Sequence, residues 1–139
     1  MAKRTLPTSL KQITYRDFDI QFRRHPSTGK LLIKKDDEAV KQALKTLILT
    51  NFYEKPFFPR FGGNLRARLF DNFNSITAEL FKSQIETAIR NFEPRVALAK
   101  NGVIVQQQPD RNTLIVTIRF KNVVTLNDLT LDVNLNRIR

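Results

Sequence analysis

The chain has 139 residues, of which 41% are hydrophobic and 27% are charged, a composition typical of one globular domain. It contains 24 Lys and Arg residues against 13 Asp and Glu residues, so its formal net charge is +11. The absence of cysteine excludes a disulfide framework, thiolate catalysis and Cys-ligated metal sites. The single histidine, His25, excludes a His-rich metal site, and no apolar run is long enough to span a membrane. We therefore expect a soluble, basic, intracellular protein.

The N-terminal residues predict an arm followed by one domain. Residues 1–13 are polar and are interrupted by Pro7, so we expect an extended arm that is ordered only by packing or by a partner. Its basic residues lack the apolar core of a signal peptide. Residues 14–139 contain no internal repeat and no low-complexity tract, and we expect them to form a single domain.

The domain is expected to open with a β-hairpin. Phe18, Ile20 and Phe22 alternate with polar residues, and this period of two predicts a strand. A cluster of turn-forming residues follows at 25–29, and the apolar residues 31–33 predict the returning strand.

A helix and an irregular loop are expected next. Residues 36–50 place apolar side chains at i, i+3, i+4, i+7 and i+8, with Asp36 or Asp37 as the N-cap. Residues 51–63 predict a loop, because two prolines prevent a regular helix there. Most of its phenylalanines are expected to be buried: Phe57, Phe58 and Phe61.

Two further helices complete the helical part. A short helix is expected at about residues 65–70, with Asn64 as its N-cap. The longest helix is expected at about residues 75–92, with Asn74 or Ser75 as its cap. It ends there because Pro94 disfavours helical backbone at the preceding residue.

The last third of the chain predicts strands. Residues 96–105 predict one strand or a bulged one. Asn101-Gly102 could form a tight turn, but the short arms around it favour a bulge or kink, and a clearer turn is expected at 109–112. Residues 114–121 and 129–136 alternate between apolar and polar side chains, so each strand buries one face. The fold class is therefore α+β, with a largely antiparallel sheet and about three helices packed on one face.

The sequence favours no enzyme. A glycosidase needs two facing carboxylates, one with a raised pKa, and no spacing selects such a pair. The acidic residues considered for this role are Glu54, Asp71, Glu79, Glu86 and Glu93. There is no nucleophile elbow, phosphate-binding loop or dinucleotide fingerprint. We expect no catalytic residue, no cofactor and no metal, and a lysozyme-like hydrolase is a remote alternative.

The positive charge makes a nucleic-acid-binding domain the main alternative. Residues 1–50 contain 11 basic and 5 acidic residues, a net charge of +6, and dominate the positive field. This charge fits an acidic protein surface as well as it fits phosphate. Base preference and a steep salt dependence would distinguish nucleic-acid binding from protein assembly.

The chain resembles the sheath-initiator baseplate wedge proteins of contractile-tailed phages, which have relatives in type VI secretion baseplates. The resemblance covers about residues 15–139. Its most specific part is Glu93-Pro94-Arg95 at a helix-to-strand junction. The other matching segments lie in the predicted helices, the central loop and the last strands: residues 47–50, 54–57, 59, 61–62, 69–70, 85–92, 96, 117–120 and 137–139.

The resemblance implies a structural role with one copy per wedge of a sixfold assembly. The implied location is the tail baseplate of the virion, after assembly in the host cytoplasm. The implied partners are baseplate wedge core proteins and the tail sheath protein, with inner hub or tube proteins as further candidates. Neither a membrane nor nucleic acid is an expected partner. The sheet would start the sheath by accepting strands from its first ring.

Six residues are expected to bind partners: Glu93, Pro94, Arg95, Glu54, Lys55 and Asn134. The resemblance places the first three on the wedge core, whereas the residue pattern alone also fits a helix stop with a local salt bridge. Under the partner hypothesis, Arg95→Ala should leave the melting temperature nearly unchanged. The family commonly has Gly-Glu-Arg-Pro in the central loop, where this chain has Tyr-Glu-Lys-Pro at residues 53–56. Lys55 therefore keeps the positive charge of the family's arginine but lacks its planar two-pronged donor. Asn134 lies in the last strand, which no later predicted element covers.

Overall fold

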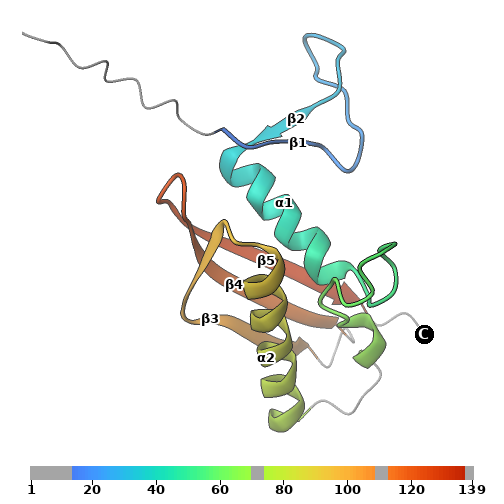
Figure 1. The fold of residues 1–139 in the computed structure, drawn as a ribbon, viewed down its shortest axis with the longest axis vertical. Helices are drawn as coiled ribbons and strands as arrows, with labels where there is room; N and C mark the ends of the chain where they lie inside the picture. The colour runs from blue at the N-terminus through green and yellow to red at the C-terminus, as the bar shows by residue number, and fades with distance from the viewer. Residues whose placement is uncertain (1–13, 70–73, 109–112, 137–139) are drawn as a thin grey trace, which may run out of the picture.

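The computed structural model describes residues 14–69, 74–108 and 113–136 (Figure 1). The predicted arm, the end of the predicted short helix and the predicted turn at 109–112 lie outside these residues. The elements follow one another as β1 (Arg16–Phe18), β2 (Ile33–Lys35), α1 (Asp36–Leu49), η1 (Arg66–Arg68), α2 (Ser75–Phe92), β3 (Val96–Gln108), β4 (Thr113–Asn122) and β5 (Asp128–Asn136).

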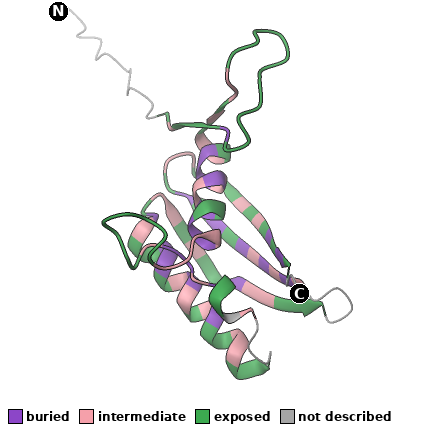
Figure 2. Cartoon of the chain, turned by 90° about the vertical axis from the view of Figure 1, so that its right-hand side faces the viewer, coloured by how far each residue is buried: buried purple, intermediate pink, exposed green. Residues whose placement is uncertain are grey.

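The described strands form two separate antiparallel sheets, one of β1 and β2 and one in the order β3-β4-β5. Both α-helices lie on the same face of the three-stranded sheet, with α2 against β3 and α1 against β5 (Figures 1 and 2). The predicted α+β class with antiparallel pairing is therefore confirmed. The prediction of about three helices is wrong, because the described residues form two α-helices. The prediction of one sheet is also wrong, because they form two.

The short predicted helix is only one turn of 3₁₀ helix, η1. A helix this short gains little from its own hydrogen bonds, because the first turn is costly to form. The segment is held by Leu65, which is buried and lies just before the turn. Asn64 does not cap it; the Asn64 side chain accepts a hydrogen bond from the Phe52 backbone N–H at 3.4 Å.

The core forms where the helices meet the sheet. Alternate residues of β4 are buried, and those between them are half-buried or exposed, as the period-two pattern predicts. The stripes predicted on both helices are also buried, apart from partly buried edges. The largest fully buried core side chains are Phe120, Leu44, Ile48, Leu65, Ile85, Ile89, Ile118, Val40, Val116 and Val133.

The predicted first strand is wrong in extent and in orientation. β1 ends at Phe18, and more than half of each apolar side chain of the alternating set, Phe18, Ile20 and Phe22, is exposed. The hairpin extends away from the three-stranded sheet at the N-terminal end of α1, as Figure 2 shows. Asp19 is instead only 1% exposed.

Polar contacts explain this inversion. The Asp19 carboxylate accepts hydrogen bonds from the Arg23 side chain at 2.7 and 3.2 Å, and Lys34 Nζ lies 3.6 Å away. The hydrogen bonds from Arg23 hold the pKa of Asp19 below its usual range. Buried Gln42 of α1 donates to the Phe18 carbonyl at 2.5 Å and to Asp17 at 3.2 Å. These contacts fix the polar face of the segment against α1.

The predicted N-cap, Asp36 or Asp37, is also wrong, because α1 begins at Asp36 and its N-cap is Lys35, whose side chain makes no cap hydrogen bond. The Asp37 carboxylate instead accepts hydrogen bonds from Asn122 Nδ2 at 2.7 Å, Thr125 Oγ1 at 2.6 Å and Asn127 Nδ2 at 2.7 Å. These three contacts join the first turn of α1 to the connection between β4 and β5. We call them the Asp37 latch.

We expect Asp37→Asn to weaken the acid sensitivity of folding. The hydrogen bonds from Thr125, Asn127 and Asn122 lower the pKa of Asp37 from its ordinary 3.8. A lowered folded-state pKa stabilises the fold above the ordinary value, and this stabilisation is lost as the pH falls through the folded pKa. Urea unfolding between about pH 7 and about pH 2 should therefore show a shallower decline in the variant than in the parent. Exposed Asp128→Asn is the control, and an equal decline in the parent and both variants would contradict the prediction.

Candidate functional site

The Glu-Pro-Arg motif forms the corner between α2 and β3. Glu93 follows α2, and its backbone N–H donates to the Ile89 carbonyl at 2.9 Å. The Glu93 side chain is 7% exposed and accepts from Arg95 Nε at 2.5 Å and from Arg95 Nη2 at 2.6 Å. Pro94 is exposed between them. The two charged residues therefore form a bidentate pair within the chain.

Further contacts hold Arg95 in place. The guanidinium lies 5.0 Å from the centre of the Tyr15 ring, and the Arg95 carbonyl accepts from the Val123 N–H at 2.9 Å. The Arg95 side chain is 27% exposed. The hydrogen bonds to the Glu93 carboxylate raise the pKa of Arg95, so the guanidinium stays charged throughout the physiological range. The corner therefore exposes Pro94 and part of the Arg95 side chain, whose position is fixed by these contacts.

The central loop is shaped by its own charged residues. The Glu54 carboxylate accepts from the backbone N–H and the side-chain amide of Asn51, both at 2.8 Å. These bonds, with the backbone N–H as the larger cause, lower the pKa of Glu54. Lys55 Nζ lies 4.0 Å from the centre of the Phe61 ring and 5.1 Å from that of Phe58. Both predicted partner-binding residues therefore contact their own loop.

Phe61 connects this loop to the Glu93 corner. Its ring lies 5.1 Å from the ring of Phe92, the last residue of α2. Phe61, Phe92 and Glu93 share a pocket of about 510 Å³ with residues 17–20. The structure therefore brings Glu93 close to the loop that contains Glu54 and Lys55. Asn134, the sixth predicted residue, lies elsewhere, on β5.

The prediction that the loop phenylalanines are buried is wrong for two of the three. Phe57 is 97% exposed and Phe58 is exposed, whereas Phe61 packs against the core. Tyr53 is also exposed, and both Tyr53 and Phe57 have φ values of 66°. Sequence reasoning missed this exposed aromatic group. Aromatic residues next to prolines are the only signal of it in the sequence, and that pattern also fits a packed loop.

The edges of the three-stranded sheet differ. β5 pairs with β4 in an unbroken register over all nine of its residues. The pairing of β3 with β4 is interrupted between Leu98 and Val103, where Asn101 has a φ of 53°. The predicted bulge is therefore confirmed, and it lies on the β3 edge. Asn134 is exposed on β5 and pairs with Ile115 of β4.

The surroundings of Glu93, Glu79 and Glu54 do not suit a hydrolytic pair. Glu93 is bound by Arg95, and Glu79 lies on the surface 3.8 Å from Lys82. The pKa of Glu54 is lowered, the opposite of what a general acid requires. Asp71 lies outside the described residues.

The described ranges also contain neither a candidate metal site nor a candidate membrane span. Within these ranges, no three His, Cys, Asp or Glu residues lie close enough together to hold a metal ion. No helix of the described residues is long and apolar enough to cross a membrane.

Comparison with known proteins gives the family. Residues 34–125 match the model of the family "baseplate wedge protein gp25". The baseplate wedge protein gp25 of Enterobacteria phage T4 is 39% identical over 92 residues, which are 66% of this chain and 67% of the T4 protein. The chain belongs to the gp25 family. The expected resemblance to baseplate wedge proteins of contractile phage tails is therefore confirmed.

Two solved structures share the fold of this gp25 family member. A Geobacter sulfurreducens protein, provisionally assigned as a tail lysozyme, superimposes with a TM-score of 0.69 at 19% identity and covers 79% of this chain and 98% of its own. A chain of the baseplate of the anti-feeding prophage superimposes with a TM-score of 0.60 at 21% identity. The match covers 88% of this chain and 86% of the prophage chain. Residues 34–125 include the loop and the Glu93 corner but not Asn134.

Proposed function

We propose that this gp25-family protein attaches to the core of a baseplate wedge and starts the tail sheath by offering the free edge of β5 for strand addition. Its partners are wedge core proteins and the sheath protein, with one copy in each wedge. The exposed, unbroken edge of β5 carries this proposal. Strand addition needs an edge with unpaired backbone N–H and C=O groups.

The contrast between the two sheet edges supports β5. Proteins protect free edges with bulges, prolines and inward-pointing charges. β3 has such a bulge, whereas β5 contains no proline, and its two charged residues, Asp128 and Asp132, are exposed and do not point inward. The residues of β5 that face the helices are apolar: Leu129, Leu131, Val133 and Leu135. β5 is therefore the edge that lacks protection against an added strand.

The Glu93 corner and the central loop are the proposed wedge-core surface. The contact between Phe61 and Phe92 joins the loop to the corner. Pro94 is exposed at the corner, and Tyr53 and Phe57 are exposed in the loop. Aromatic and arginine side chains are enriched among the residues that contribute most to protein–protein binding. Glu93 acts mainly by orienting Arg95.

A hydrolase role is not supported by the carboxylates described above, and the similarity to the Geobacter protein at 19% identity concerns the fold alone. We therefore propose a structural protein and not an enzyme. We also propose no nucleic-acid partner, because the family to which the chain belongs is one of baseplate wedge proteins.

Asn134→Pro tests the proposal, because proline removes a backbone donor and fixes φ on the β5 edge. We expect baseplates and tubes that contain the variant but carry no sheath, whereas Asn134→Thr should assemble full sheaths. Gln107→Pro on β3 is the matched control. Gln107 pairs with Leu114, whose backbone groups are directed to β5, so the N–H of Gln107, like that of Asn134, points away from β4. Electron microscopy of tails provides the measurement. Normal sheaths with Asn134→Pro, or loss of sheath only with Gln107→Pro, would contradict the choice of β5.

A further inference from the structure

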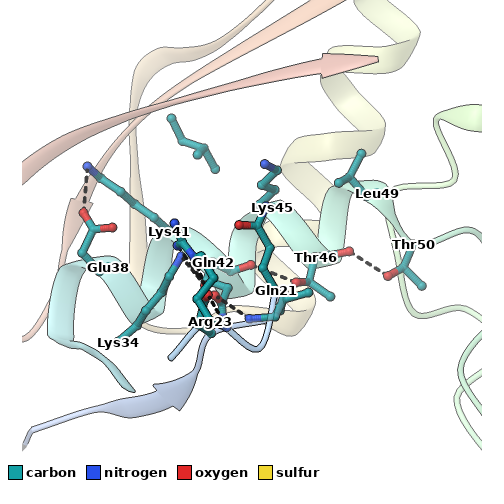
Figure 3. Close-up of a pocket in the computed structure, with 13 residues that line it drawn as sticks. Gln21, Arg23, Lys34, Glu38, Lys41, Gln42, Lys45, Thr46, Leu49 and Thr50 are labelled. Carbon is teal, nitrogen blue, oxygen red and sulfur yellow. Dashed lines mark hydrogen bonds and ion pairs between the residues drawn. The ribbon is translucent and has the colours of Figure 1, made fainter. Parts of the chain in front are cut away.

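A basic pocket lies beside β5, between α1 and the N-terminal segment (Figure 3). Its volume is about 520 Å³. One wall is the flank of α1 that carries Lys41, Lys45 and Leu49, and the opposite wall contains Arg23 and Lys34. From the sheet only Leu131 of β5 reaches the pocket.

The charges in this pocket do not cancel. It is lined by four basic residues, Arg23, Lys34, Lys41 and Lys45, and by two acidic residues, Asp19 and Glu38. Arg23 and Lys34 share Asp19, and Lys41 lies 3.7 Å from Glu38. Among the residues that the structure describes, no carboxylate lies within ion-pair distance of Lys45. The pocket therefore has an excess of two positive charges, and Lys45 lies in it without a counter-charge.

The position of Leu131 determines what a new strand would place there. Leu131 belongs to the set of β5 residues that face the helices. Directly paired residues of neighbouring strands point to the same face of a sheet. In a strand added to β5, the side chain opposite Leu131 would therefore point toward α1 and enter this pocket, beside Lys41 and Lys45.

We propose that the strand which adds to β5 carries an aspartate or glutamate opposite Leu131, and that Lys45 and Lys41 select it by its charge. This inference rests on the proposed function of β5 and adds the chemistry by which the correct strand is recognised. Backbone pairing alone accepts almost any sequence, so register and specificity must come from side-chain pockets. Leu49, Ile20 and Leu131 line the same pocket and suit the methylene groups of a glutamate.

Three synthetic nine-residue peptides test the proposal. They share an alternating Val/Thr sequence and differ only in the central residue of the apolar face, which is Glu, Gln or Lys. Each is titrated into the isotope-labelled full chain, and amide NMR shifts report both the dissociation constant and the strand that is contacted. We expect shifts along β5, with the Glu peptide binding about fivefold more tightly than the Gln peptide at low salt and the Lys peptide binding most weakly.

Charge-matched variants identify the selecting residues. Lys41→Gln combined with Lys45→Gln should abolish the preference for Glu. Lys82→Gln should keep it, because Lys82 lies on α2, which packs against β3. Equal binding of the three peptides along β5, or a preference that survives the double variant, would overturn the charge selection and leave strand addition standing. Shifts along β3 only, or no binding of any peptide, would overturn strand addition at β5 and this inference with it.

Discussion

Arg95→Ala is expected to lower the free energy of unfolding by about 2–3 kcal/mol. Removing one partner of a buried ion pair costs roughly 3–5 kcal/mol, because the other charge remains buried and unpaired. The lower figure applies here because 27% of the Arg95 side chain is exposed, so water compensates part of the loss. The melting temperature should therefore fall, contrary to the result expected from the sequence. Urea unfolding of the purified variant measures the effect.

A double variant separates folding from partner binding at this corner. Glu93→Gln with Arg95→Met removes both charges, so no buried charge is left alone and most of the stability should return. If the corner binds the wedge core, the double variant should fold but fail to enter baseplates. A double variant that is as unstable as Arg95→Ala would contradict the ion-pair account. A stable one that enters baseplates normally would contradict the partner role.

Gly62→Ala is expected to destabilise the domain by about 3 kcal/mol or more. Gly62 has a φ of 120°, and an added Cβ would lie 2.3 Å from the Thr50 carbonyl oxygen. Both the backbone strain and the contact with a fixed backbone oxygen would be costly. The adjacent N–H of Gly63 donates to the Leu47 carbonyl at 2.9 Å, so the loop cannot move away without losing its contacts with the end of α1.

Gly29→Ala is the matched control for this prediction. Gly29 also has a positive φ, 64°, but an added Cβ there would meet nothing within 4 Å. Its substitution should cost only about 1 kcal/mol, the usual penalty for a left-handed residue. The larger loss expected for Gly62→Ala in urea unfolding combines the contact with Thr50 and the greater strain of a φ of 120°, which lies beyond the left-handed region that other residues adopt. Equal losses in the two variants would contradict this account.

The elements that local signals define were predicted well from the sequence. The α2 helix occupies residues 75–92 as expected, because the Asn74 side chain accepts from the Thr77 N–H at 2.8 Å and Pro94 lies just beyond its end. β4 was predicted for a similar reason, since its period-two pattern reports directly on one buried face. Neither inference required knowledge of distant residues.

The parts that were predicted wrongly depend on partners far away in the sequence. The period-two pattern of residues 18–22 indicated the wrong buried face, because Gln42 and Lys34 provide polar partners for the other face. Phe57 and Phe58 are exposed, and the turns around them are stabilised by hydrogen bonds between Asn51 and Glu54 that the sequence pattern does not report. For the candidate site, the motif predicted the location of the Glu93 corner. It did not predict how deeply Glu93 is buried.

The Asp37 latch also bears on the kinetics of folding. Its three hydrogen bonds join residues that are 85, 88 and 90 positions apart in the sequence. Such a distant contact requires the closure of a large loop, so we expect it to form after local structure and the pairing of β4 with β5 have brought the ends together. Interactions that form after the transition state slow unfolding and leave the folding rate almost unchanged. The latch therefore acts chiefly on the lifetime of the folded domain, the quantity that determines how long it resists mechanical or proteolytic opening.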